Sequence, residues 1–215
     1  APAIDLTLFR QRSFRIGTLV GGAARVGFNG VPFLLPLMLQ VGFGVSPVVS
    51  GSITFVSALS TLFVRAFVTR LLRLYGFARV LGGSAIAGSA MIAAFALLNA
   101  DTPHWIIVIC VFLYGMTRSC QFMASNTLSY SDTPAAQLSR ATSLGGVLQQ
   151  LSVSFGVSLA AVLLGLVSHN SGHLTPEHFH LAFLMMAVIP LLAIPGFVFL
   201  HPEDGVQVSG HAGRR

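Results

Sequence analysis

Two arginines lie in the middle of long apolar stretches of this 215-residue sequence, and each has an amide side chain close by. Arg25 is followed one helical turn later by Asn29, and Arg118 is followed by Gln121, so in helices each pair shares a face. Ser125 lies on the same face as Arg118 and Gln121. Two fixed positive charges with no acid nearby indicate pairing with a carboxylate or attraction of an anionic or amphipathic ligand.

A second set of polar residues lies between 149 and 158. Gln150, Ser154 and Ser158 form an i, i+4, i+8 row, and Gln149 begins the adjacent row, which continues through Ser152 and Gly156. Small polar residues at such spacing also serve as plain helix-packing contacts, and that alternative stays open.

Other chemistry finds little support in the sequence. The six acids all lie outside the apolar stretches, so this chain lacks an obvious intramembrane proton carrier. We find no HExxH, Gly-x-Ser-x-Gly or phosphate-binding motif, and we predict no enzymatic activity, no cofactor and no metal site. Cys110 and Cys120 are expected to be free thiols, and the His residues of 168–180 to belong to a solvated loop.

The surrounding sequence has the composition of an integral membrane protein. It is 54% hydrophobic and 8% charged, and its mean hydropathy is +0.81, whereas soluble domains have about 25% charged residues. The net charge of +6 comes from arginines that lie between apolar runs, so we predict no nucleic-acid binding. Six segments are close to the roughly 20 residues that cross a bilayer as a helix. These segments are 16–41, 47–69, 79–99, 104–128, 142–168 and 179–200.

The depth of each arginine within its segment separates two cases. Arg25 lies about ten residues inside its segment and Arg118 about fourteen, which places both near the bilayer centre. An arginine there faces a bundle interior, a water-filled cavity or a partner, and bonding within the bundle is the alternative to a role in a substrate path. Arg65 is about one turn from its membrane surface, which its side chain can reach.

The arginines also predict the orientation, because short cytoplasmic loops are enriched in Lys and Arg. They occur before the first segment, between the second and third, between the fourth and fifth, and at the C-terminal end. We therefore expect both termini in the cytoplasm, with a lead-in segment 1–15, a six-helix membrane domain 16–200 and a cytoplasmic tail 201–215. No signal peptide is evident, and the absence of an initiating Met indicates a fragment or a processed chain.

Three stretches carry a family resemblance: PAIDLTLFRQRSFR (2–15), LPLMLQVGFGVSPVVSG (35–51) and SRATSLGGVLQQLSVSFGVSLA (139–160). Their order and spacing resemble the C-terminal half of a major facilitator superfamily transporter, most closely the fourteen-helix drug:proton antiporters of the EmrB/QacA type. In the loop between the second and third helices, that family commonly has Gly-x-Leu-x-Asp-Arg-x-Gly. This chain reads TRLLRLYG (69–76) and has Arg73 in place of the Asp. The candidate residues of this cytoplasmic loop motif are Arg70, Arg73, Gly76 and Arg79.

The resemblance implies an all-α membrane fold of two inverted three-helix repeats, in which the first helix of each repeat lines a central cavity. It also implies that an N-terminal half, with the proton-titrating acids, is missing from this chain. The candidate cavity residues are Arg25, Asn29, Arg118, Gln121, Gln149 and Gln150.

We therefore expect the C-terminal half of a proton-coupled multidrug or small-molecule efflux permease in the bacterial inner membrane, working by alternating access. Its expected partners are lipid, the missing half, a small-molecule substrate and protons. The alternatives are a non-transporting six-helix membrane scaffold or sensor, a homodimeric half-transporter and a membrane-embedded enzyme. Whether Arg25 and Arg118 meet a substrate or acids of the other half stays open.

Overall fold

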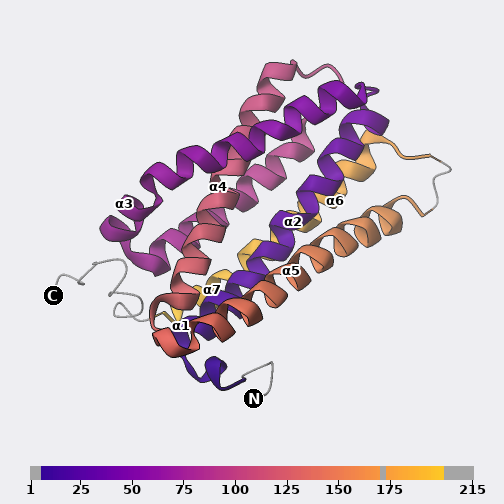
Figure 1. Ribbon diagram of the computed structural model, residues 1–215. Coiled ribbons are helices and arrows are strands. Elements are labelled where there is room, and N and C mark those ends of the chain that lie inside the picture. The colour runs from indigo at the N-terminus through magenta and orange to yellow at the C-terminus, as the bar shows by residue number, and fades with distance from the viewer. Residues whose placement is uncertain (1–5, 170–172, 201–215) are drawn as a thin grey trace.

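The computed structural model describes residues 6–169 and 173–200, and every regular element in these ranges is a helix. Five helical stretches there are long and apolar enough to cross a bilayer, which confirms the predicted all-α membrane fold. Figure 1 shows the long helices packed side by side in a bundle. The helices are α1 (Arg12–Arg15), α2 (Gly21–Leu37), α3 (Pro47–Ala94), α4 (His104–Ser131), α5 (Leu138–Val167), α6 (Pro176–Leu192) and α7 (Ile194–Val198).

The longest stretch, Pro47–Leu97, accounts for two of the six predicted spans. At Gly76 the backbone leaves the helical region, with φ 74° and ψ 167°, a conformation that is open almost only to glycine. Figure 1 shows α3 turning back on itself, so it has a first arm (residues 47–75) and a second arm (residues 77–94). The stretch between the second and third predicted segments, 70–78, is therefore helical on both sides of a single-residue bend.

The first span begins earlier than predicted. Helical backbone runs without interruption over Arg12–Gly42, because a π-helical turn, Ile16–Val20, joins α1 to α2. Pro32 and Pro36 lie inside α2, where each removes a backbone N–H donor. A second π-helical turn, Met38–Gly42, follows them directly, and such wider turns absorb local disruption of a helix.

The last two spans also begin earlier than predicted. Helix α5 begins at Leu138 instead of 142. Helix α6 begins at Pro176 instead of 179, because Thr175 forms a capping box with His178. The predicted tail 201–215 and the first five residues of the lead-in segment lie outside the described residues.

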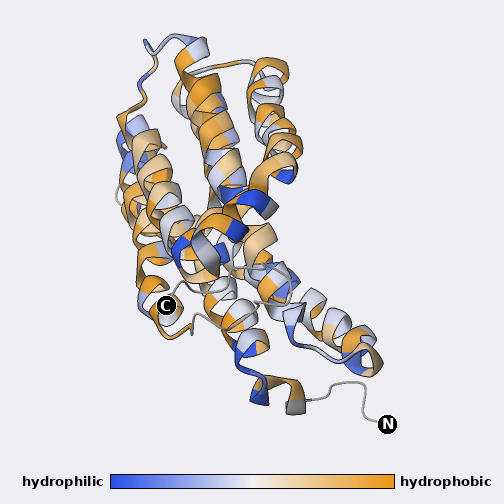
Figure 2. Ribbon diagram, turned by 90° about the vertical axis from the view of Figure 1, so that its left-hand side faces the viewer, coloured by the Kyte–Doolittle hydropathy of each residue, from blue (hydrophilic) through white to orange (hydrophobic). Residues whose placement is uncertain are grey.

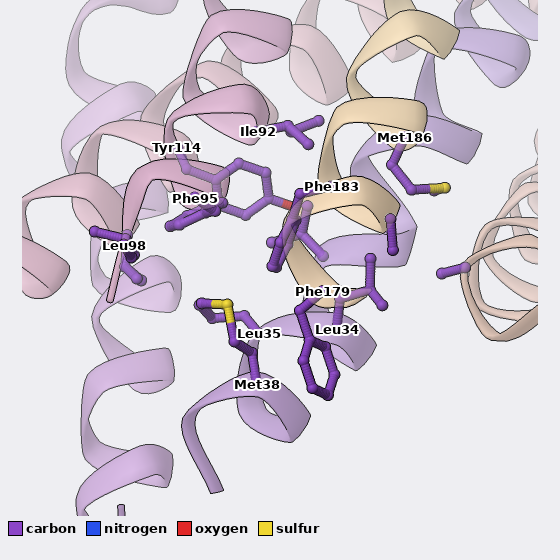
Figure 3. Packing of buried hydrophobic residues seen from close by; sticks show 14 of the residues in the cluster. Leu34, Leu35, Met38, Ile92, Phe95, Leu98, Tyr114, Phe179, Phe183 and Met186 are labelled. Carbon is purple, nitrogen blue, oxygen red and sulfur yellow. The ribbon is translucent and has the colours of Figure 1, made fainter. Parts of the chain in front are cut away.

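The main apolar cluster joins α2, the end of α3, α4 and α6. The ring of Phe95 lies 5.6 Å from that of Tyr114 and 5.4 Å from that of Phe183, measured between centroids. Figure 3 shows these rings together with Met38 and Met186 between the helices. Figure 2 shows that hydrophobic residues also cover most of the length of the long helices, as lipid-facing surfaces require.

The arginines that lie between the apolar segments are found at one end of the bundle. Figure 1 shows α1, the bend of α3 and the start of α5 at this end. At the opposite end, His180 Nε2 lies 2.8 Å from the carbonyl oxygen of Leu98. Three hydrogen bonds join the chain around the start of α1 to the residues that follow α4 and α7: Arg12 to the Phe199 carbonyl, Ser13 to the Asp132 carboxylate, and Thr133 to Gln11.

Candidate functional site

Two hydrogen bonds cross between α2 and α4 in opposite directions. Arg25 Nη2 of α2 donates to Asn126 Oδ1 of α4 at 2.6 Å, and Arg118 Nη2 of α4 donates to Asn29 Oδ1 of α2 at 3.4 Å. Each helix thus supplies one guanidinium and one amide to its neighbour. Spacings of four residues on α2 and eight on α4 keep each pair on one helix face.

The ring of Phe122 lies beside both guanidinium groups. The central carbon of the Arg25 guanidinium is 5.0 Å from the ring centroid, and that of Arg118 is 4.8 Å away. A cation over an aromatic face gains about 0.5–2 kcal/mol, and more when both are removed from water. We call Arg25, Asn29, Arg118, Phe122 and Asn126 the arginine cluster.

The two arginines differ in how firmly they are held. Arg25 is only 3% exposed, and its Nη2 also donates to the carbonyl oxygen of Phe122 at 3.3 Å. Arg118 is half-buried. The one hydrogen bond described for its side chain is the 3.4 Å contact with Asn29, close to the limit for a hydrogen bond. Arg25 therefore links α2 to α4 within the bundle, whereas the side chain of Arg118 is partly accessible.

The arginine cluster has more donors than acceptors. Arg25 Nε, Arg118 Nε and Asn29 Nδ2 are buried and have no hydrogen-bond partner among the described residues. A buried donor left unpaired costs about 1–3 kcal/mol. The cluster is thus under-satisfied in a way that an additional acceptor would relieve.

Gln121 lies apart from these contacts. It is fully buried, and its Oε1 accepts a hydrogen bond from Ser84 Oγ on the second arm of α3, 2.5 Å away. Although Gln121 follows Arg118 by less than one turn, the structure pairs it with a different helix. It therefore links α4 to α3, while Arg118 links α4 to α2.

The two polar rows of α5 have different surroundings. Ser152 and Gly156 are buried, and a Cβ added at Gly156 would lie only 2.6 Å from the carbonyl oxygen of Val26, so this row packs against α2. Gln149, which begins it, is half-buried, and the other row is exposed along its length. The members of that exposed row are Gln150, Ser154 and Ser158.

The loop-motif residues lie at the bend of α3 and take no part in the crossed hydrogen bonds, which join α2 to α4. Gly76 forms the bend, and Arg70, Arg73 and Arg79 are exposed around it. Arg79 also lines a cavity of about 350 Å³ between the two arms of α3 and α4, whose other walls are mostly apolar. No residue of the arginine cluster contributes to that cavity.

No group of three or more His, Cys, Asp or Glu that could hold a metal ion occurs within residues 6–169 and 173–200. Both cysteines are free thiols, Cys120 buried and Cys110 half-buried. The chemistry of the described site is therefore that of cations, amides and an aromatic ring.

Two members of the arginine cluster were not among the candidate residues taken from the sequence. Phe122 and Asn126 follow Arg118 at intervals of four, and Tyr114 precedes it by four and donates to the carbonyl oxygen of Phe28 at 2.6 Å. This i, i+4 row is the face of α4 that meets α2. Extending the spacing rule from Arg118 in both directions would have found it.

Comparison with known proteins gives a consistent result. Proteins named multidrug resistance protein MdtD are 33% identical to this chain in Pectobacterium carotovorum, 34% in Escherichia coli O6:H1 and 31% in Cronobacter sakazakii. The matches cover 94–98% of this chain and 44–45% of those relatives, so the chain spans less than half of their length. Residues 17–214 match the Major Facilitator Superfamily, a family of transporters. On these matches and its apolar helical bundle, the chain belongs to the major facilitator superfamily.

Proposed function

We propose that this chain is the C-terminal half of a proton-coupled small-molecule efflux permease of the bacterial inner membrane. The names of its relatives support multidrug efflux as the activity. The single observation that carries the proposal is the pair of crossed Arg–Asn hydrogen bonds, because polar groups near the bilayer centre are costly and in transporters mark the substrate path.

In this proposal the permease works by alternating access, with the two halves rocking about a site near the membrane midplane. The arginine cluster and the exposed α5 row, beginning at Gln150, form the wall that this half contributes. From Gln150 onward this exposed polar row runs beside exposed apolar residues of the same helix, which fits a surface that meets the other half or a water-filled path.

For proton coupling, the described residues offer no carboxylate in the middle of a span. The acids within the described ranges are Asp101, Asp132 and Glu177, and all three lie at helix ends or in turns. We therefore assign the proton-titrating carboxylates to the other half of the permease.

The test measures efflux from cells that express the whole transporter from its native gene, using amphipathic dyes that include rhodamine 123 and fluorescein. We expect at least one dye to be exported faster than from cells without the transporter, and a protonophore to stop that export. Arg25→Ala and Arg118→Ala should each reduce export at unchanged protein levels. Export of no dye would contradict the efflux proposal, and full export by both variants would remove the cluster from the substrate path.

One observation favours a second candidate, a non-transporting membrane scaffold. Arg25 is almost completely buried and bonded within the bundle, as in a sealed six-helix protein. That candidate predicts a stable protein with no energy-dependent movement of any solute, so the same efflux measurement separates the two.

A further inference from the structure

The unpartnered groups of the arginine cluster all have the same polarity. Arg25 Nε, Arg118 Nε and Asn29 Nδ2 are hydrogen-bond donors, while the Oδ1 acceptors of Asn29 and Asn126 are already used by the arginines. Guanidinium has no acceptor, and no acceptor within the described residues is bonded to these three donors. What is lacking is an acceptor, and preferably a negatively charged one.

The two positive charges of the cluster also favour an acceptor that carries a negative charge. Two guanidinium groups lie beside one ring, and the polar partners that the structure gives them are amide and carbonyl oxygens. The nearest acid to Asn126 along α4 is Asp132, which follows the end of that helix and accepts a hydrogen bond from Ser13. A carboxylate would supply both a negative charge and two acceptor oxygens, which match the fork of an arginine.

The difference between the two arginines identifies which one meets the ligand. Arg25 is buried and fixed by two hydrogen bonds, so it acts as a positioning residue that holds Asn126 and adds positive potential. Arg118 is half-buried and has one long hydrogen bond, which a stronger acceptor can replace. Phe122, half-buried beside both guanidinium groups, offers an apolar surface next to the charge.

We infer that Arg118, with the side-chain amide of Asn29, binds the carboxylate of an amphipathic organic anion whose apolar part packs on Phe122. This inference rests on the proposed transport function and names a ligand class for its site. An acidic side chain of the other half would present the same carboxylate, and the experiment separates these two sources.

The experiment uses the purified whole transporter in detergent and two dyes with the same xanthene core. Fluorescein carries a free carboxylate, whereas rhodamine 123 is a methyl ester with a positive charge. Fluorescence polarisation gives the affinity for each dye. We expect Arg118→Gln to weaken fluorescein binding by roughly tenfold or more, since hydrogen bonds to charged groups contribute about that factor. Rhodamine 123 binding should be unchanged or stronger.

Arg65→Gln is the matched control, because it removes one cation from an exposed position on the first arm of α3. It should bind both dyes as the unmodified transporter does. If Arg118→Gln is not monodisperse in size-exclusion chromatography, Arg118→Lys decides. It keeps the charge but loses the bidentate fork, and we expect it to weaken fluorescein binding several-fold while leaving rhodamine 123 binding intact.

The inference is overturned if Arg118→Gln and Arg118→Lys leave fluorescein binding within twofold. It is also overturned by an equal loss of binding for both dyes, or by an equal loss in Arg65→Gln. A lower unfolding temperature of Arg118→Gln with unchanged fluorescein binding assigns the carboxylate to an acidic side chain of the protein, which also overturns it. Failure of the proposed function would instead appear as the absence of energy-dependent dye efflux.

Discussion

At the scale of single residues, Asn126 is the partner that keeps the buried Arg25 in place. It accepts the shorter of the two crossed hydrogen bonds, at 2.6 Å. We expect Asn126→Ala to lower the free energy of unfolding by roughly 1–3 kcal/mol, because it leaves a buried charged donor without that partner. The midpoint of thermal unfolding in detergent measures the effect. Thr127→Ala is the control, since the bond described for its hydroxyl is to the Met123 carbonyl of its own helix. Equal losses in both variants would contradict the assignment.

The backbone at position 76 has a conformation that favours glycine. Its φ of 74° and ψ of 167° cost other residues about 1–3 kcal/mol. Gly76→Ala should therefore lower the unfolding midpoint. Gly82→Ala, in the helical second arm, should leave it unchanged or raise it, because an added Cβ there meets nothing within 4 Å and alanine favours a helix more than glycine does. An unchanged midpoint for Gly76→Ala would mean that the bend tolerates another conformation.

The arginine cluster shows how far residue patterns reach. The i, i+4 spacing correctly puts Arg25 and Asn29 on one face of α2, but it cannot say that each arginine bonds to the asparagine of the other helix. Gln121 illustrates the limit. It is three positions from Arg118, and only the packing of α3 against α4 decides that it bonds to Ser84. Neighbours across an interface depend on helix rotation, which the sequence of one helix does not encode.

At the scale of helices, α2 and α5 approach closely at Gly156. An added Cβ would lie 2.6 Å from the Val26 carbonyl oxygen and 2.7 Å from Asn29 Cβ. We expect Gly156→Val to push the helices apart and lower the free energy of unfolding by about 1–3 kcal/mol. Because Asn29 lies at this contact, dye binding should weaken too. Gly165→Val on the same helix is the control, because a Cβ added there meets nothing within 4 Å. It should leave the size-exclusion profile unchanged, and a similar fall in the free energy of unfolding in both variants would reject the close contact.

Hydropathy predicted the helices well and their ends less well. All six apolar segments are helical, because lipid leaves the backbone no other partner. The ends depend on local chemistry that hydropathy ignores. Arg12 and Leu138 extend the helices into polar sequence, and Thr175 caps α6 before its apolar run begins. Between the second and third predicted segments, Gly76 alone forms the bend where a loop was expected.

At the scale of the whole molecule, the bundle leaves one polar row uncovered. Helix α5 is the least buried of the candidate spans, since only 22% of its most apolar stretch is buried within the bundle. Its exposed polar row includes Gln150, whereas Ser152 and Gly156 on the adjacent row are buried. The first row therefore has to meet something other than this chain. That agrees with a chain that spans less than half of its relatives.

The two ends of the bundle are chemically distinct, and their difference predicts the orientation. Arginines lie around α1, the bend of α3 and the start of α5, whereas the turn 98–103 at the opposite end contains none. We expect the arginine-rich end to lie in the cytoplasm. Ser139 and Asp101, both exposed, mark the two ends.

Single-cysteine labelling of the whole transporter measures this directly. In a cysteine-free background, with Cys110 and Cys120 replaced by Ala, a membrane-impermeant maleimide is applied to intact cells and to permeabilised cells. Asp101→Cys should react in both, and Ser139→Cys only after permeabilisation, because the bilayer separates the two ends. The reverse pattern would invert the orientation and place the arginine-rich end outside. Labelling of both positions in intact cells would mean that the two ends are not on opposite sides of a sealed membrane, which the length of every long helix argues against.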